Sequence, residues 1–185
     1  MPIINSRNAE KDGLMQVAKL MLLSARTAPK SGGVDDILTA IVSGPGKESL
    51  AKEMDKIAEE RNISAFKRDA DNVRNSEYIL LAGVRGIVKH GINCGACGYA
   101  NCEDFEKADK KIRQDFTGPN CVFKVLDLGI ALGSAVKTAS LHNVDNRIMY
   151  RIGAAAKRLK MLSEASVIMG IPVSAKGKSI YFDRR

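Results

Sequence analysis

The run Tyr78-Ile-Leu-Leu-Ala-Gly-Val84 gives the strongest strand signal in this chain of 185 residues. A nearly continuous apolar run of this length is typical of a strand that is covered on both faces of its sheet. We therefore expect a central strand here, with other elements packed above and below it. Loops that follow such strands commonly carry the chemistry of a sheet protein.

The rest of the chain alternates between helical and extended patterns on either side of this run. Apolar residues recur at helical spacing in five segments, and short apolar runs predict three further strands. The predicted helices cover residues 9–27, 47–61, 103–113, 122–141 and 148–162, and the other predicted strands cover 37–42, 63–66 and 166–171. Residues 68–76 are polar and read as a turn of helix or a loop, and Asn143 or Asp145 is the expected cap of the last helix. This order predicts an α/β or α+β sandwich formed by a single domain, 1–185.

All four cysteines lie in the segment that follows the central strand. Cys94-Gly-Ala-Cys97-Gly-Tyr-Ala-Asn-Cys102 supplies three, and Cys121 is the fourth, giving the spacing C-x2-C-x4-C-x18-C. Thiolates are soft ligands, and four together suit a zinc ion or an iron–sulfur cluster. Gly95 and Gly98 allow tight turns that bring backbone N–H groups towards sulfur. We therefore predict a metal-binding segment at residues 91–121.

The spacing bears on which metal binds. A structural zinc site usually combines two short ligand pairs, whereas a three-cysteine turn closed by a distant fourth cysteine is more typical of a four-iron cluster. A zinc knuckle would need His at 102 and Cys near 107, where this chain has Cys102 and Lys107. The motif resembles that of a small four-iron domain, C-G-x-C-G-x-x-x-C with a distant Cys. That resemblance implies a [4Fe-4S] cluster held by Cys94, Cys97, Cys102 and Cys121; zinc stays the alternative.

Charge and composition limit the partners. The 29 basic and 21 acidic residues give a formal net charge of +8, which suits an acidic protein, a phosphate-bearing cofactor, nucleic acid or a plain lysine-rich surface. Aromatic residues make up only 5% and there is no Trp, which argues against stacking on nucleic-acid bases. There is neither an apolar run long enough to cross a membrane nor an apolar signal core. We expect a cytoplasmic protein whose thiols stay reduced.

The C-terminal stretch Gly170-Ile-Pro-Val-Ser-Ala-Lys-Gly-Lys-Ser-Ile-Tyr-Phe-Asp-Arg resembles the end of a prokaryotic family of uncharacterised ferredoxin-domain proteins. The Cys-Gly-x-Cys-Gly turn and His142-Asn-Val-Asp-Asn-Arg-Ile-Met-Tyr-Arg-Ile-Gly are also similar to that family. The likeness extends over essentially the whole chain. It supports the cluster but implies no particular activity.

A second resemblance, at the level of the fold, is to the flavin nitroreductases. It rests on Ala25-Arg-Thr-Ala-Pro-Lys-Ser-Gly-Gly, on the apolar stretch 127–141 and on Gly170-Ile-Pro. It implies an α+β nitroreductase-like sandwich with a cysteine-rich insert, usually an intertwined homodimer with FMN at the interface. The candidate FMN phosphate or ring contacts are Arg7, Arg26 and Ser31, in the stretches of the resemblance, together with Lys176 and Lys178 of the basic tail. The alternative for the tail is a solvated basic segment or a dimer arm. The basic motif of these enzymes is reduced here to Ser6-Arg7, and Gly-Gly replaces an expected Asn, so the sequence leaves FMN binding open.

The leading hypothesis is therefore a cytoplasmic iron–sulfur protein that passes single electrons to a flavin or to another redox partner. The alternatives are a zinc-binding module that contacts nucleic acid and a cluster with a purely structural role. His90, four residues before Cys94, is either an ordinary loop residue or a ligand or proton relay. No catalytic residue, electron donor, acceptor or substrate follows from the sequence, so oxidoreductase activity is left open.

Overall fold

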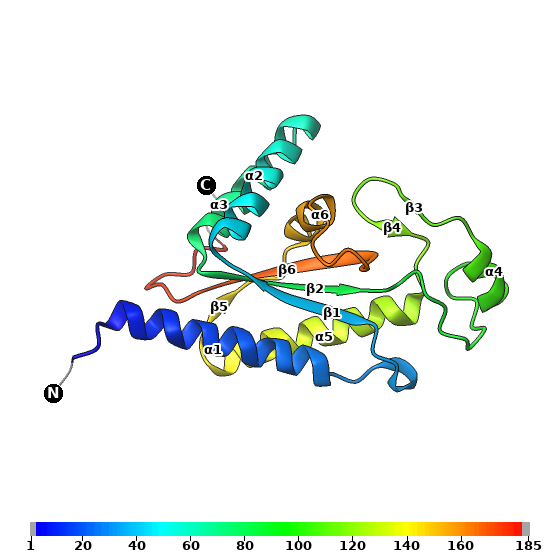
Figure 1. Cartoon of the computed structure of the whole chain (residues 1–185), viewed down its shortest axis with the longest axis horizontal. Helices are drawn as coiled ribbons and strands as arrows, with labels where there is room; N and C mark the ends of the chain where they lie inside the picture. The colour runs from blue at the N-terminus through cyan, green and yellow to red at the C-terminus, as the bar shows by residue number, and fades with distance from the viewer. Residues whose placement is uncertain (1–2, 183–185) are drawn as a thin grey trace.

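A four-stranded antiparallel sheet organises the molecule. The computed structural model describes residues 3–182 and orders the strands β1-β2-β6-β5 (Figure 1). The central strand β2 (Tyr78–Val84) is buried along its whole length, as predicted. It pairs with β1 (Ile37–Val42) on one side and β6 (Val167–Ser174) on the other, and the short β5 (Asp145–Asn146) extends β6.

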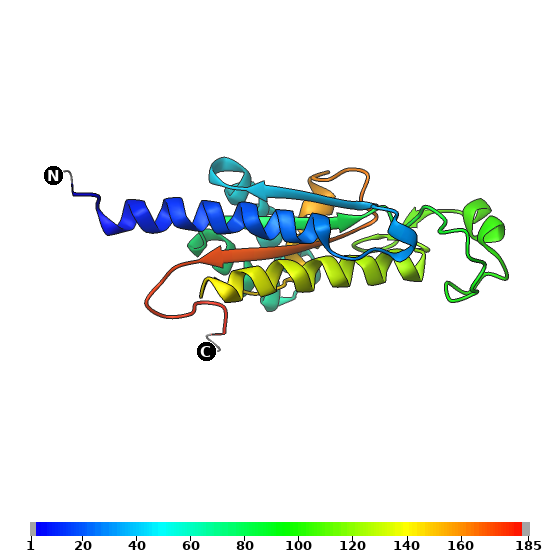
Figure 2. The ribbon, with the colours of Figure 1, turned by 90° about the horizontal axis from the view of Figure 1, so that it is seen from below.

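One face of the sheet is covered by two long helices that run side by side (Figure 2). These are α1 (Ser6–Thr27) and α5 (Val122–Leu141). Met21 of α1, Ala131 of α5 and Leu80 of β2 are fully or almost fully buried in the core between the helices and the sheet. The predicted bounds of α5 are confirmed, but its outer face carries exposed apolar residues, so the helix is buried on one side only.

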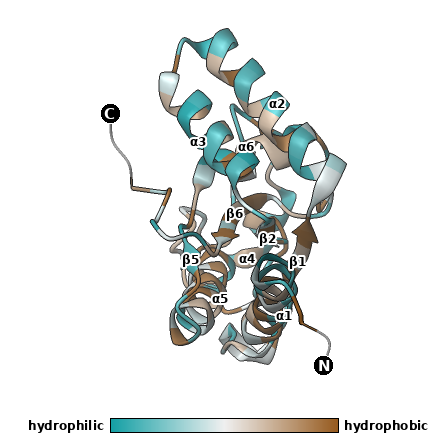
Figure 3. Ribbon diagram, turned by 90° about the vertical axis from the view of Figure 1, so that its left-hand side faces the viewer, coloured by the Kyte–Doolittle hydropathy of each residue, from teal (hydrophilic) through white to brown (hydrophobic). Residues whose placement is uncertain are grey.

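The opposite face is covered by α2 (Gly44–Arg61), α3 (Ser64–Asn75) and α6 (Tyr150–Arg158), so the sheet lies between two helical layers (Figure 3). Helix α6 packs very closely on β6. A Cβ atom built on Gly153 would lie 1.7 Å from the carbonyl oxygen of Ile168, so only glycine permits this approach. Within residues 3–182 no helix is long and apolar enough to cross a membrane.

Three local predictions were wrong. Residues 63–66 are not a strand but belong to the start of α3, because Phe66, Ala70 and Val73 share the buried face of this helix. Of the two interpretations of 68–76, the helical one is confirmed as far as Asn75. The helix expected at 103–113 is the shorter α4 (Cys102–Lys107), and the chain then forms a hairpin of β3 (Lys111–Ile112) and β4 (Thr117–Gly118). Helix α6 is capped by Met149 rather than by Asn143 or Asp145, since 145–146 pair with β6 as β5.

Candidate metal centre

Three of the four cysteines lie on a projection that we call the cysteine arm (residues 87–116). The arm leaves the end of β2, carries α4 and returns through the β3–β4 hairpin (Figure 1). Cys94 is exposed and Cys97 and Cys102 are partly exposed, and all are free thiols. Gly95 and Gly98 have φ values of +72° and +88°, and the N–H of Gly98 donates to the carbonyl of Gly95 over 2.9 Å. The predicted glycine turn is therefore present, and it encloses Cys97.

Cys102 is held at the start of α4 by a reciprocal contact with Asn93. The Asn93 N–H donates to Cys102 Sγ at 3.3 Å, and the Cys102 N–H donates to Asn93 Oδ1 at 2.8 Å. An N–H group directed at sulfur stabilises the thiolate over the thiol and is a common way to tune metal-bound sulfur. The N-terminal half of the arm is thus tied to the helix that follows it.

Cys121 belongs to the body of the molecule rather than to the arm. It is buried, with 6% of its surface exposed, and it immediately precedes α5. Its N–H donates to the carbonyl of Gly86 over 2.7 Å, just beyond the end of β2. The N–H of Gly86 donates in turn to Ser166 Oγ at 2.9 Å, at the start of β6. The fourth thiol is therefore fixed to the end of the sheet from which the arm departs.

Several cations lie near these thiols. Lys124, three residues after Cys121, is buried and forms an ion pair with Asp36. Burial lowers the pKa of Lys110, and the charges of Cys97 and Glu106 oppose this shift. The Lys110 ammonium also lies 3.3 Å from the ring centroid of Phe105.

The chemistry of the donor set fits a thiolate-bound metal, but the sulfur atoms are not gathered. Within residues 3–182 no group of three or more Cys, His, Asp or Glu side chains is close enough to hold a metal ion. The three arm thiols do not form such a group even among themselves, and Cys121 belongs to the body, so joint ligation within the described residues requires the arm to rearrange. The four-cysteine ligand set stays a prediction.

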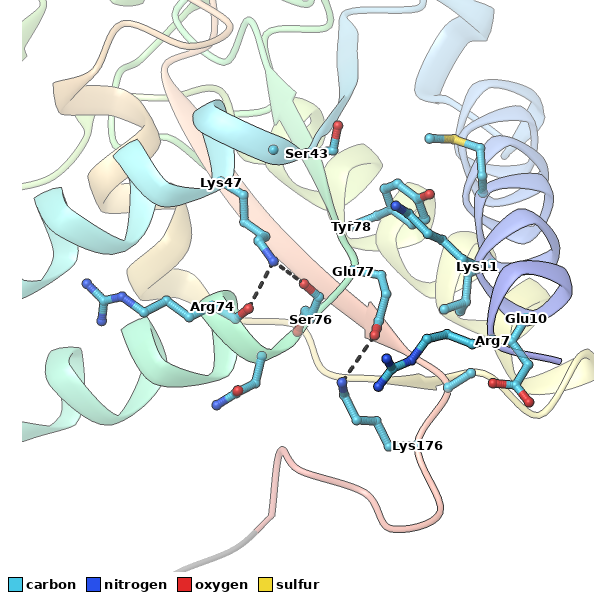
Figure 4. A pocket seen from close by; sticks show the side chains of 15 residues that line it. Arg7, Glu10, Lys11, Ser43, Lys47, Arg74, Ser76, Glu77, Tyr78 and Lys176 are labelled. Carbon is cyan, nitrogen blue, oxygen red and sulfur yellow. Dashed lines mark hydrogen bonds and ion pairs between the residues drawn. The ribbon is translucent and has the colours of Figure 1, made fainter. Parts of the chain in front are cut away.

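A basic cavity lies at the opposite end of β2 (Figure 4). It has a volume of about 890 Å³ and opens between the start of α1, the start of α2 and the end of β6. Its cationic lining residues are Arg7, Lys11, Lys47, Arg74 and Lys176, and its acidic ones are Glu10 and Glu77. Lys47 Nζ donates to the carbonyls of Arg74, at 2.9 Å, and Ser76, and Lys176 lies 3.2 Å from the carboxylate of Glu77. Burial lowers the pKa of Lys47.

The five predicted flavin contacts separate into two groups within one chain. Arg7 and Lys176 line the basic cavity, and Lys178 follows two residues after Lys176. Arg26 lies 19 residues along α1 from Arg7, which corresponds to about 28 Å. Arg26 forms an ion pair with Asp35, and Ser31 follows in the loop after α1.

Sequence reasoning missed the contribution of α2 to the cavity. The signal was Ser43-Gly-Pro-Gly-Lys47, where a helix begins with Pro near its first position and places Lys47 in its first turn. Lys47 bonds to carbonyls at the end of α3, and the other cationic lining residues include side chains from the start of α1 and from just after β6, so only the folded chain brings them together.

The comparison with known sequences places the chain in a family. A protein of Archaeoglobus fulgidus, described as an uncharacterized protein, is 50% identical over 182 residues, which is 98% of this chain and 97% of that protein. The family described as "Uncharacterized protein containing a ferredoxin domain (DUF2148)" matches residues 117–184. This segment contains Cys121 but not the three cysteines of the arm. The chain belongs to this family of ferredoxin-domain proteins, which confirms the first resemblance.

The comparison with solved structures gives the fold. A nitroreductase-like family protein from Bacillus cereus superposes with a TM-score of 0.57 at 9% identity, covering 92% of this chain and 79% of that one. An FMN-dependent nitroreductase from Mycobacterium smegmatis in complex with NADPH superposes with a TM-score of 0.55 at 10% identity, covering 88% of this chain and 78% of that one. Nitroreductase A from Vibrio parahaemolyticus gives 0.53 at 13% identity, and 97% of this chain spans only 62% of that one. The α+β nitroreductase-like fold is thereby confirmed. Sequence identities this low show a shared fold and do not assign the activity of these enzymes to this chain.

Proposed function

We propose that this chain is a redox protein that holds a [4Fe-4S] cluster on the thiolates of Cys94, Cys97, Cys102 and Cys121. The observation that carries the proposal is that the arm bearing three free thiols leaves the same end of β2 to which Cys121 is hydrogen-bonded. The ferredoxin domain of the family supports it. When bound, such a cluster accepts and returns one electron at a time.

The chain's own residues would prepare the site in three ways. The turns at Gly95 and Gly98 free backbone N–H groups to approach sulfur, and the Asn93 N–H already donates to Cys102. The buried Lys124, one turn beyond Cys121, pairs with Asp36 and so ties the start of α5 to the chain before β1. Since ligation deprotonates thiols and orders the chain that carries them, we expect cluster assembly and closure of the arm to be coupled.

The test is reduction of anaerobically prepared protein with dithionite, followed by electron paramagnetic resonance. A signal from a reduced four-iron cluster supports electron transfer to a redox partner that is not yet identified. A four-iron cluster that never accepts an electron would favour the structural alternative. Zinc without sulfide would favour the zinc-binding module that contacts nucleic acid.

A second proposal is that the basic cavity holds the phosphate of FMN. Its support is that Arg7 and Lys176, both predicted as flavin contacts, line one cavity together with Lys47 and Lys11. Arginine and lysine are the usual partners of phosphate. Arg7→Ala and Lys176→Ala should each weaken FMN binding about tenfold, measured by quenching of flavin fluorescence, while Lys137→Ala in α5 serves as the control. Unchanged affinity in both cavity variants would reject the site.

Flavin binding would also account for a homodimer, which we propose as the state of the protein in solution. Arg26 and Ser31 lie too far from Arg7 to contact the same flavin within one chain, so a second copy would have to supply them. Leu126 and Ile130 are exposed on the outer face of α5, where a second copy could bury them. Sedimentation should give twice the chain mass, and Ile130→Glu should give the monomer. A wild-type monomer at micromolar concentration would contradict the proposal.

A further inference from the structure

His90 links the two parts of the candidate metal centre. It lies in the arm between β2 and Cys94, and its Nε2 atom is 2.7 Å from Ser31 Oγ. Its ring packs edge-on against Phe123, with 5.9 Å between ring centroids. Phe123 is two residues after Cys121. His90 therefore contacts the helix that follows the fourth cysteine while its own chain continues to the first.

The surface that receives His90 is firmly held. The N–H of Ser31 donates to Oδ1 of Asp127 over 2.9 Å, and Asp127 is a buried residue of α5. Gly32 has a φ of +62°, and a Cβ built on it would lie 3.2 Å from His90 Cε1. The turn after α1 thus leaves room for the imidazole ring and presents one hydroxyl to it.

The other ring nitrogen indicates what this contact does. His90 Nδ1 is buried and has no hydrogen-bond partner within the described residues. A nucleophilic serine needs a histidine that a third group orients through this atom. Since that group is missing from residues 3–182, the Ser31–His90 pair is better suited to holding the arm than to catalysis.

The far end of the arm is held separately. Asp115 lies 2.7 Å from Arg61 of α2 and accepts a hydrogen bond from Tyr150 of α6, and Phe116 packs against the same tyrosine. The arm is therefore attached to one helical layer at its start and to the other at its end. Only the first attachment also contacts the residues that follow Cys121.

We propose that His90 is a positioning residue of the cysteine centre, which anchors the base of the arm beside the residues that follow Cys121 through its bond to Ser31 and its contact with Phe123, so that the arm cysteines approach Cys121 from a fixed point. This inference rests on the proposed cluster. The metal ligands need a fixed separation, and loss of residues that orient ligands typically lowers metal affinity 10- to 100-fold.

The test compares Ser31→Ala, His90→Phe, His90→Ala and the double variant Ser31→Ala/His90→Phe after anaerobic assembly with iron and sulfide. We measure the rate of iron loss to a chelator and the midpoint potential. His90→Ala should lose iron about tenfold faster than wild type. The double variant should lose iron no faster than either of its single variants, because both substitutions remove the same hydrogen bond. His142→Ala, at the exposed end of α5, is the matched control and should change neither quantity.

A second readout separates this inference from the proposed function. In metal-free protein, His90→Ala should raise amide hydrogen exchange in residues 87–101 about tenfold while β2 stays protected. If wild type binds no iron and sulfide, the cluster proposal fails, but the exchange experiment still decides the role of His90. The inference would be overturned if amide hydrogen exchange in the arm of metal-free His90→Ala were the same as in wild type. It would also be overturned if loaded His90→Ala lost iron at the wild-type rate and kept the wild-type midpoint potential.

Discussion

The two ends of β2 differ in how they are built. At the Val84 end, the chain presents thiols on an exposed arm that is held by a few hydrogen bonds and ring contacts. At the Tyr78 end, cations from several elements surround one cavity of the folded body. The strand separates the two by about 20 Å. Because the proposed metal site and the proposed phosphate site lie at different ends, we expect that each can be removed without the other.

The largest expected effect is at the cysteine end. Cys97→Ser should lose the cluster and its visible absorbance completely, because serine is a poor ligand for iron at neutral pH. FMN affinity should stay within twofold of wild type, since the cavity is at the other end. Iron, sulfide and flavin assays on the same preparation check both statements. A variant that keeps four irons would remove Cys97 from the ligand set.

Between the two ends of β2, we expect substitutions to cost the most stability where α6 packs against β6. Gly153→Ala introduces a methyl group 1.7 Å from the Ile168 carbonyl, and we expect the free energy of unfolding to fall by about 3 kcal/mol. Urea denaturation measures this loss. A decrease below about 1 kcal/mol would mean that α6 does not approach the strand this closely.

Near the cavity end of β2, titration of Tyr181 should lower the stability of the fold at alkaline pH. Burial raises the pKa of Tyr181 to about 12, and its hydroxyl lies 2.9 Å from Ser76 Oγ. Above pH 10 the unfolded chain loses this proton while the folded chain keeps it, so stability falls between about pH 10 and pH 12. The loss attributable to this group approaches about 2 to 3 kcal/mol.

Tyr181→Phe isolates that contribution. The variant should lose about 1 kcal/mol at pH 8, because Ser76 loses a hydrogen-bond partner, but it should show a shallower decline above pH 10. Denaturant midpoints at pH 8, 10 and 11 for both proteins give the difference. Parallel curves would show that Tyr181 titrates normally.

The smallest effect is expected on the outer face of α5. A Cβ on Gly129 would meet no atom within 4 Å, and alanine is the better helix former. Gly129→Ala should therefore raise the free energy of unfolding by about 0.5 to 1 kcal/mol. Chemical denaturation under dilute, monomeric conditions measures it. Destabilisation there would indicate that the α5 face is covered.

The sequence predicted elements best where an apolar run had clear polar or glycine boundaries. The bounds of β1, β2 and α5 agree to the residue. It failed at α3, because Ile63–Phe66 is too short to distinguish a strand from the first turn of a helix. It also missed β5, whose two residues are extended only because they pair with β6.

The candidate sites were predictable to different degrees. The cysteine spacing is local and could be recognised directly, as could the glycine turn inside it. The contact between Ser31 and His90 joins residues 59 positions apart, and no local sequence pattern in either segment predicts that the two meet. The basic cavity likewise depends on parts of α1, α2, α3 and β2 and on the chain after β6, which meet only after folding.

The most direct measurement is the content of iron, acid-labile sulfide and zinc in protein purified without oxygen. Four irons and four sulfides per chain, with zinc near zero, are expected of the cluster. One zinc per chain without sulfide would contradict it.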